Sequence, residues 1–147
     1  MTENTRAMKR ISKELEKFIS DPESIWIDNV QPMRWRIGIK GAEKSLYAKE
    51  IYHLIFVFTN DYPMTAPTVT FEKPPVHEHI YSNGHLCLNV LYDDWSPALT
   101  CYNICLSIVS MMSSATEKKT PPDDAAYSKS SSRDPKKTMW HFHDEAC

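Results

Sequence analysis

The apolar residues near the start of the chain recur at the three- and four-residue spacing of a helix. One face carries Met8, Ile11, Leu15, Phe18 and Ile19. The remaining surface carries charged residues, namely Lys9, Arg10, Lys13, Glu14, Glu16 and Lys17. This pattern predicts an amphipathic first helix. We expect Asp21-Pro22 to end it, because the residue before a proline avoids the helical region.

The period of the pattern changes to two between residues 24 and 71, which indicates strands. Trp35, Ile37 and Ile39 alternate with other residues, and residues 51–58 form a long β-branched and aromatic run expected to be a central strand. Residues 68–71 add a short strand, and residues 25–27 add an edge strand whose limits Pro32 blurs. Since the links are short and contain no helix, we expect an antiparallel meander.

A second, buried helix is predicted after Thr100, its expected N-cap. Its apolar face consists of Cys101, Ile104, Cys105, Ile108 and Met112. The composition turns polar from residue 113, so we expect a short helix at most, around residues 123–129, and considerable mobility. Residues 138–143 are aromatic enough to fold back onto the domain. Residues 1–113 are thus the expected core of one α+β domain, and residues 114–147 an atypical, partly flexible C-terminal segment.

Composition narrows the class of protein without fixing a function. The chain has 147 residues, 41% apolar content and a net charge of −2, so nothing points to a nucleic-acid or membrane partner. The first residues lack the apolar core of a signal peptide, and no apolar run is long enough to span a membrane. Four cysteines without an export signal favour a reducing compartment, which predicts the cytoplasm or nucleus.

The stretch from His77 to Leu91 concentrates the reactive side chains. An Asn83-Gly84 turn lies among three histidines and is followed by Cys87, whose neighbours are apolar. A thiolate is a strong nucleophile, and a lone cysteine with nearby histidines suits covalent catalysis. The alternative is packing, because free cysteine is among the most buried residue types.

Zinc binding is a further alternative for these residues, since histidine and cysteine are the ligands that zinc prefers, and two sites are conceivable. One would use His77, His79, His85 and Cys87. The other would use Cys101, Cys105, His141 and His143. Neither has the spacing of a common zinc finger, so no metal and no cofactor is predicted. With only three glycines, at positions 38, 41 and 84, the chain has no phosphate-binding loop, and it contains no GxSxG or HExxH motif.

The motifs taken together resemble the ubiquitin-conjugating enzyme family. They are, in order, a basic first helix (AMKRISKEL), a meander, a DYPxxxP loop, an H-x-x-x-YSNGxxCL stretch, and WSPAL before a buried helix. The resemblance runs from about residue 7 to residue 112. Within the family the chain looks most like the W type, which shares the YSNGH, DWSPAL and PPD segments and a PKKT-x-W tail ending in cysteine. W-type enzymes attach ubiquitin to N-terminal α-amino groups, especially of proteins with disordered starts.

The resemblance implies roles for single residues. Cys87 matches the cysteine that carries ubiquitin as a thioester, and the family scaffold would present that thiol to solvent. Most members have His-Pro-Asn upstream, whose Asn stabilises the oxyanion or braces the loop. Here His77 belongs to the frame of the loop, and His79 stands at the Asn position. Its neighbour Glu78 replaces the proline that even the W type keeps. A neutral imidazole retains one N–H donor, so His79 is either a catalytic residue or a surface histidine.

Two asparagines complete the expected support of the active-site loop. Asn83 precedes the turn, and Asn89 falls where many lysine-directed members place an Asp. Near the second acidic position of those members this chain has residues 117–123, without a firm alignment. Weak acid provision suits an α-amine. Roughly a fifth to a third of α-amino groups are neutral near pH 7.4, against about 0.1% of lysines.

The resemblance also implies partner surfaces. Lys9, Arg10 and Lys13 fall where the family meets the ubiquitin-activating enzyme. Two loops match those that receive RING or U-box ligases, and they contain Tyr62, Pro63 and Met64 in the first and Ser96, Pro97 and Ala98 in the second. Met64 replaces the usual Phe, and a flexible thioether still fills an apolar groove. Loop rigidity is the alternative role of the prolines, and Trp95 is the expected packing anchor.

The prediction is therefore a ubiquitin-conjugating enzyme that uses Cys87, with N-terminal α-amines of proteins with accessible N-termini as acceptors. Three alternatives stay open. The chain could conjugate lysines or carry another ubiquitin-like modifier, it could be a non-catalytic ubiquitin-binding adaptor, or it could be a zinc-stabilised structural module.

Overall fold

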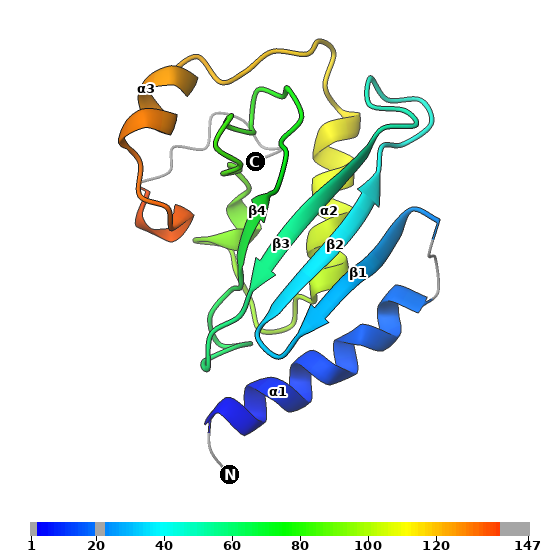
Figure 1. Ribbon diagram of the computed structural model, residues 1–147, viewed down its shortest axis with the longest axis vertical. Coiled ribbons are helices and arrows are strands. Elements are labelled where there is room, and N and C mark those ends of the chain that lie inside the picture. The colour runs from blue at the N-terminus through cyan, green and yellow to red at the C-terminus, as the bar shows by residue number, and fades with distance from the viewer. Residues whose placement is uncertain (1–2, 20–22, 139–147) are drawn as a thin grey trace.

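The computed structural model describes residues 3–19 and 23–138, which form one four-stranded sheet with helices around it (Figure 1). The main elements are α1 (Glu3–Glu14), β1 (Ile25–Gln31), β2 (Arg34–Lys40), β3 (Ile51–Val57), β4 (Thr68–Phe71), α2 (Cys101–Ser113) and α3 (Asp124–Ser130). Short 3₁₀ turns are η1 (Leu15–Ile19), η2 (Asn89–Leu91) and η3 (Pro135–Lys137). The predicted α+β class and the order of its elements are confirmed.

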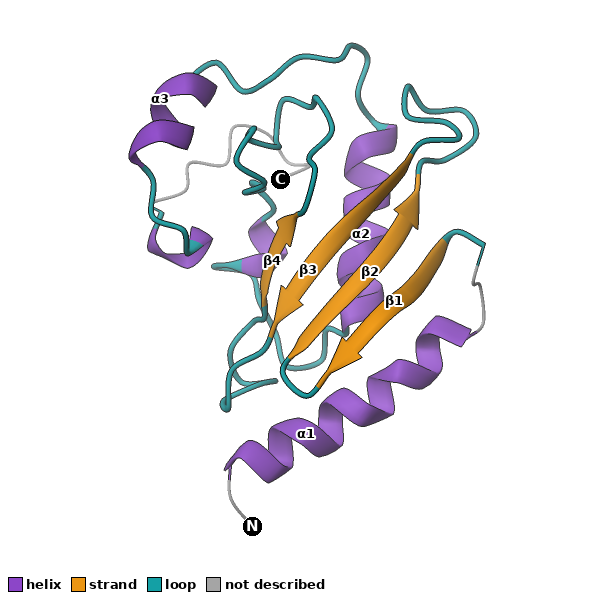
Figure 2. Ribbon diagram, viewed as in Figure 1, coloured by secondary structure: helices purple, strands orange, loops and turns teal. Residues whose placement is uncertain are grey.

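The sheet is the predicted antiparallel meander, with strand order β1-β2-β3-β4. Each strand pairs with its sequence neighbour, so that Ile37 lies opposite Leu54 and Leu54 opposite Phe71. The alternation of the sequence therefore places one set of side chains on a single face, where Trp35, Ile37 and Leu54 have no exposed surface. Helix α2 covers this face, as Figure 2 shows, and the core lies between the two.

Helix α2 begins where the sequence predicts. The Thr100 side chain accepts from the Asn103 backbone N–H at 3.2 Å, and the Asn103 side chain accepts from the Thr100 backbone N–H, which makes a capping box. Its buried side chains are Cys101, Ile104, Cys105, Ile108, Met111 and Met112, which include all five of the predicted apolar face. The residue types at helical spacing thus decide which face enters the core.

Two predictions for the first helix are wrong. Ile19, assigned to the apolar face, is 76% exposed, because the helix tightens into η1 at Leu15 and the tighter winding turns Ile19 outward. Glu14, assigned to the polar face, is only 4% exposed. The predicted helix end at Asp21-Pro22 lies outside the described residues. None of the described helices is long and apolar enough to cross a membrane.

The buried Glu14 carboxylate is explained by its partners. The backbone N–H of Cys101, at the first position of α2, donates to Glu14 Oε1 at 2.6 Å, and the Tyr62 hydroxyl donates to Oε2. Arg10 Nε donates to Oε2 at 3.0 Å. A carboxylate at a helix N-terminus complements the positive end of the helix dipole, and buried charge is tolerated when paired and hydrogen-bonded. Glu14 therefore joins α1, α2 and the loop that contains Tyr62.

Replacing Glu14 with alanine should lower the free energy of unfolding by about 2–4 kcal/mol, because the Cys101 N–H and the Tyr62 hydroxyl lose their buried acceptor. Urea titration followed by tryptophan fluorescence measures this loss. The matched control is Glu16→Ala, on the exposed face of the following turn. Equal and small losses in the two variants would show that Glu14 does not hold these elements together.

Candidate active site

Residues 77–87 fold back on themselves and bring Cys87 beside His79. Isolated β-bridges pair His77 with Ile80 and Ile80 with Leu86. The Cys87 backbone N–H donates to the His79 carbonyl at 2.8 Å, and the Tyr81 N–H donates to the His85 carbonyl at 2.8 Å. The backbone thus fixes the position of the cysteine relative to both arms of the loop.

The turn between the arms depends on Gly84. Its φ is +93°, a conformation that side chains with a Cβ rarely adopt, and a Cβ there would lie 2.4 Å from the Phe71 carbonyl oxygen. The close approach is used, because the Phe71 N–H donates to the Gly84 carbonyl at 2.9 Å. Asn83 supports the turn through its side-chain oxygen, which accepts from the His85 N–H at 3.1 Å. The predicted Asn83-Gly84 turn therefore anchors the loop to β4.

His77 connects the loop to the end of α2. The residue is buried, and its Nδ1 accepts the His79 backbone N–H at 2.9 Å. The proton of the neutral ring therefore resides on Nε2, which lies 3.2 Å from the Met111 carbonyl and donates to it. This arrangement gives His77 the framing position that the sequence suggests.

Cys87 is less exposed than the resemblance implies. The residue is 5% exposed, whereas we expected an accessible thiol. It differs from Cys101 and Cys105, which have no exposed surface and belong to the core cluster. Burial raises the pKa of both core thiols above the ordinary value. Of the three cysteines in the described part of the chain, Cys87 is thus the one on a loop, while Cys147 lies outside that part.

His79 and Glu78 extend the site toward the segment that follows α2. His79 is 7% exposed, and its Nε2 lies 4.0 Å from Glu78 Oε1. Glu78 Oε2 lies 3.6 Å from the Nζ of Lys119. The residue in place of the family proline therefore carries a charge that faces both the imidazole and a lysine.

Asn89 organises the chain that follows the cysteine. It begins η2, and its Nδ2 donates to Asp94 Oδ2 at 2.7 Å. Its backbone carbonyl accepts from the N–H groups of Tyr92 and Asp94 at 3.0 and 3.1 Å. Asn89 thus holds the chain after Cys87 in a tight turn, in which the Asp94 carboxylate is bound to the Asn89 side chain.

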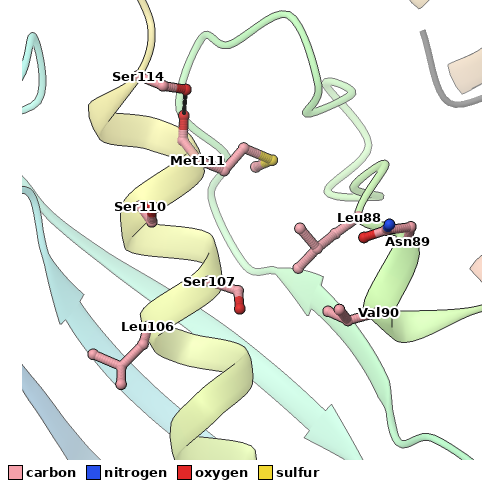
Figure 3. A pocket seen from close by; sticks show the side chains of 8 residues that line it. All are labelled: Leu88, Asn89, Val90, Leu106, Ser107, Ser110, Met111 and Ser114. Atoms are coloured by element: carbon pink, nitrogen blue, oxygen red, sulfur yellow. Dashed lines mark hydrogen bonds between the residues drawn. The ribbon is translucent and has the colours of Figure 1, made fainter. Parts of the chain in front are cut away.

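A groove begins immediately after the cysteine (Figure 3). It encloses about 400 Å³ between α2 and the segment of Leu88, Asn89 and Val90. The α2 side presents Leu106, which is 45% exposed, together with the small side chains of Ser107 and Ser110. Small residues on the helix leave the room that the groove occupies.

Sequence reasoning missed the contacts of residues 123–138, which we name the docked segment. The Tyr81 hydroxyl donates to Asp123 at 2.9 Å, and the Ser82 N–H donates to Asp124 at 2.7 Å. The Asn83 side chain donates to Ser131 at 3.0 Å. Figure 1 shows α3 beside the loop. The predicted short helix is confirmed as α3, while its mobility stays a prediction.

A weak signal for this docking exists in the sequence. Pro121-Pro122-Asp123 marks a turn before α3, and Tyr127 is an aromatic residue among serines. Periodicity of apolar residues does not show which way serine and aspartate side chains point, so the partners of these residues were not predictable. At its far end the docked segment reaches the first partner loop, where the Lys136 ammonium donates to the Ala66 carbonyl.

The predicted partner residues divide into exposed and structural members. Lys9, Lys13, Pro97 and Ala98 are exposed, and Met64 is 71% exposed. Arg10 is instead bound to the second loop, where its Nη2 donates to the carbonyls of Pro97 and Leu99 at 2.9 and 3.0 Å.

Tyr62 is buried, so its side chain supports the first loop from inside and is not open to a partner. The predicted anchor Trp95 lies between the two loops. Its Nε1 donates to the Pro63 carbonyl at 2.9 Å, and its ring lies 6.1 Å from that of Tyr62. Ser96 adds an internal contact, since its hydroxyl accepts from the Ala98 N–H at 3.2 Å. The role of both loops as ligase contacts stays a prediction, and within them the Tyr62 side chain is buried.

The described residues contain no group of three or more histidine, cysteine or acidic side chains arranged to hold a metal ion. In the first zinc alternative, His77 already uses both ring nitrogens for backbone partners. In the second, His141 and His143 lie outside the described residues, as does the aromatic stretch that was expected to fold back.

Known proteins have a similar fold and a similar sequence. The chain is 48% identical to ubiquitin-conjugating enzyme E2 W of Caenorhabditis elegans, over 95% of this chain and 97% of the relative. It is 46% identical to a probable enzyme of the same name in Dictyostelium discoideum, over 96% and 97%. A crystal structure of the ubiquitin-conjugating enzyme E2 UbcA1 from Agrocybe aegerita matches with a TM-score of 0.84 and 33% identity, over 88% of this chain and 98% of that one.

The family model described as ubiquitin-conjugating enzyme matches residues 6–143, nearly the whole chain. Sequence, fold and a loop cysteine agree on an enzyme that passes ubiquitin through a cysteine thioester. The chain therefore belongs to the ubiquitin-conjugating enzyme family and, within it, to the W type.

Proposed function

We propose that Cys87 is the cysteine that accepts ubiquitin, and that the acceptors are N-terminal α-amines. The observation that carries the first part is the loop itself. Gly84 and His77 tie it to β4 and α2, while the other described cysteines lie in the core. In the transfer, the Cys87 sulfur bonds to the C-terminal carbonyl carbon of ubiquitin, and the thiolate of the activating enzyme leaves. An amine then attacks the same carbonyl, and Cys87 leaves as its thiolate.

The burial of Cys87 shapes this reaction. A nearly covered thiol is protected from other electrophiles and reaches ubiquitin only when an extended end of the partner enters the loop. The groove beside Leu88 and Ser110 provides space next to the cysteine for such a chain.

Incubation with activating enzyme, ATP and ubiquitin should give an adduct that a thiol reductant removes. Cys87→Ser should give a reductant-resistant ester, because an oxygen ester resists thiol attack, and Cys87→Ala should give none. Cys105→Ala is the control and should still form the adduct, since Cys105 is fully buried in α2. Gel electrophoresis with and without reductant reads the outcome. An adduct that survives Cys87→Ala would refute the assignment.

We propose that His79 assists the amine attack as a donor to the oxyanion. Its backbone carbonyl accepts from the Cys87 N–H at 2.8 Å, so the two residues are direct neighbours across the loop. A neutral imidazole supplies one N–H, and removal of one oxyanion donor in other enzymes costs roughly 10²–10³ in rate.

His79→Ala should slow discharge of the thioester to an amine about tenfold or more, and should slow loading far less, because the charge develops chiefly during the amine attack. Single-turnover assays separate loading from discharge. His79→Asn is the matched variant, since it restores a side-chain N–H donor, and it should recover most of the rate. Equal slowing of both steps by His79→Ala would make the residue structural only.

The acceptor proposal rests on the acids around the loop. Asp94 accepts from Asn89, and Asp123 accepts from the Tyr81 hydroxyl. Glu78 faces Lys119. Carboxylates held in this way bind structural partners, which leaves less capacity to deprotonate an incoming lysine. An α-amine needs less help, because a large share is already neutral near physiological pH.

A peptide substrate with a free N-terminus and internal lysines should be modified at least about tenfold faster than the same peptide with an acetylated N-terminus. The reason is the larger neutral fraction of the α-amine. Mass spectrometry of the conjugates locates the isopeptide or peptide bond. Equal rates for both peptides, with modification at lysine, would favour the lysine-directed alternative.

The exposed residues Lys9 and Lys13 are the proposed contacts for the activating enzyme. For a RING or U-box ligase we propose Met64, Pro97 and Ala98, which the two neighbouring loops present together. An exposed flexible thioether beside a rigid proline suits an apolar contact on a partner.

A further inference from the structure

We propose that Tyr127 of α3 is a positioning residue for Cys87, because it clamps both arms of the Asn83-Gly84 turn. This inference rests on the proposed function of Cys87 as the thioester cysteine. It assigns to the docked segment a part in the reaction, through one side chain that touches the loop before and after the turn.

The ring of Tyr127 holds the first arm. It packs on the ring of Tyr81 with centroids 3.9 Å apart and an angle of 31° between the planes. Contacts of this kind add stability beyond the area that they bury. Tyr81 is further fixed by its hydroxyl, which donates to Asp123 at the start of α3. The first arm is thus held by a ring contact and a hydrogen bond from the same helix.

The hydroxyl of Tyr127 holds the second arm, and the direction of its hydrogen bond is fixed. His85 Nε2 lies 3.2 Å from the Arg133 carbonyl, which can only accept, so Nε2 carries the proton of the neutral ring. Nδ1 must then accept, and it accepts from the Tyr127 hydroxyl at 2.8 Å. Burial lowers the pKa of His85, which favours this neutral form.

The chain of donors continues beyond the tyrosine. Since Tyr127 uses its proton for His85, its oxygen accepts from the Thr138 hydroxyl at 2.7 Å. The order is therefore Thr138 to Tyr127 to His85 to the Arg133 carbonyl. The first donor, Thr138, and the last acceptor, the Arg133 carbonyl, both belong to the docked segment, so His85 is bound on both ring nitrogens by that segment. Loss of the Tyr127 oxygen would break two links at once.

The two arms transmit this constraint to the cysteine. The His85 carbonyl accepts the Tyr81 N–H, and His85 lies two residues before Cys87. Electrostatics agree with this proximity. Burial raises the pKa of Tyr81 and Tyr127, and the charge of a Cys87 thiolate adds to the shift of both. The clamp therefore acts on the arm that leads directly into Cys87.

The contribution of Tyr127 to the fold is separable from its contribution to the site. Helix α3 has no buried residue, and Tyr127 is outside the core cluster. The core thiols Cys101 and Cys105 provide an internal standard, since only global opening exposes them. A change confined to Cys87 would thus report the loop and not the domain.

The test compares Tyr127→Phe, Tyr127→Ala and the control Tyr102→Ala in the full chain. Tyr102 is also half-buried and packs on an aromatic ring, that of Phe18 at 5.5 Å, but it lies on α2. Iodoacetamide alkylation is followed separately at Cys87, Cys101 and Cys105 by peptide mass spectrometry. Thioester formation with activating enzyme and ubiquitin, and thermal unfolding, are measured on the same samples.

Tyr127→Phe keeps the ring contact and should raise Cys87 alkylation about threefold, the effect of one modest hydrogen bond. Tyr127→Ala loses both contacts and should raise it about tenfold. Thioester formation should slow by similar factors, while Cys101 and Cys105 stay unreactive. Tyr102→Ala should lower the unfolding temperature and leave Cys87 alkylation within twofold of the wild type.

Three results would overturn the proposal. If Tyr127→Ala left both Cys87 alkylation and thioester formation unchanged, Tyr127 would have no role in positioning the cysteine. Equal gains at all three cysteines would show a general loss of stability. Thioester formation that is unchanged or faster would make Tyr127 a cover and not a positioning residue. If the wild type forms no thioester at Cys87, the proposed function fails, and alkylation alone still decides whether Tyr127 orders the loop.

Discussion

The carboxylate of Glu14 is the point at which separate parts of the chain become one structure. This group, on helix α1, accepts hydrogen bonds from the start of α2 and from Tyr62. Arg10 neutralises its charge and extends the connection to the carbonyls of Pro97 and Leu99. Both partner loops therefore take their position from one turn of the first helix. A mutation there acts on both loops as well as on the core.

The active-site loop follows the same principle with a different chemistry. Its Ile80 and Leu86 side chains are fully buried in the core, and its shape is further fixed by the Gly84 carbonyl, which binds β4, and by the His77 ring, which binds α2. The docked segment adds a third support from outside, through hydroxyl and carboxylate groups. Three supports from distant parts of the sequence thus position a single sulfur. This explains why the whole domain is needed to present one short loop.

The elements and the loop were predictable because each is encoded locally. Periodicity located α1, α2 and the four strands, and Asn83-Gly84 specified a turn whose φ only glycine adopts easily. What escaped prediction depends on tertiary contacts. A glutamate on a charged helix face gives no sign in the sequence that it is buried. The groups that make the burial of Glu14 possible lie 48 and 87 residues away, so no local pattern predicts it. Likewise Tyr62 resembles a partner-loop residue by its position, while its burial depends on Phe58, Trp95 and the same carboxylate.

Apart from the ring contact between Tyr127 and Tyr81, helix α3 is attached by polar groups near the surface, and it buries none of its residues. Bonds of this kind compete with water, whereas the core is held by apolar burial that water cannot replace. We therefore expect α3 to open at a lower cost in free energy than the core. Melting temperature, which reports the core, is then blind to the order of the segment that lies against the Cys87 loop.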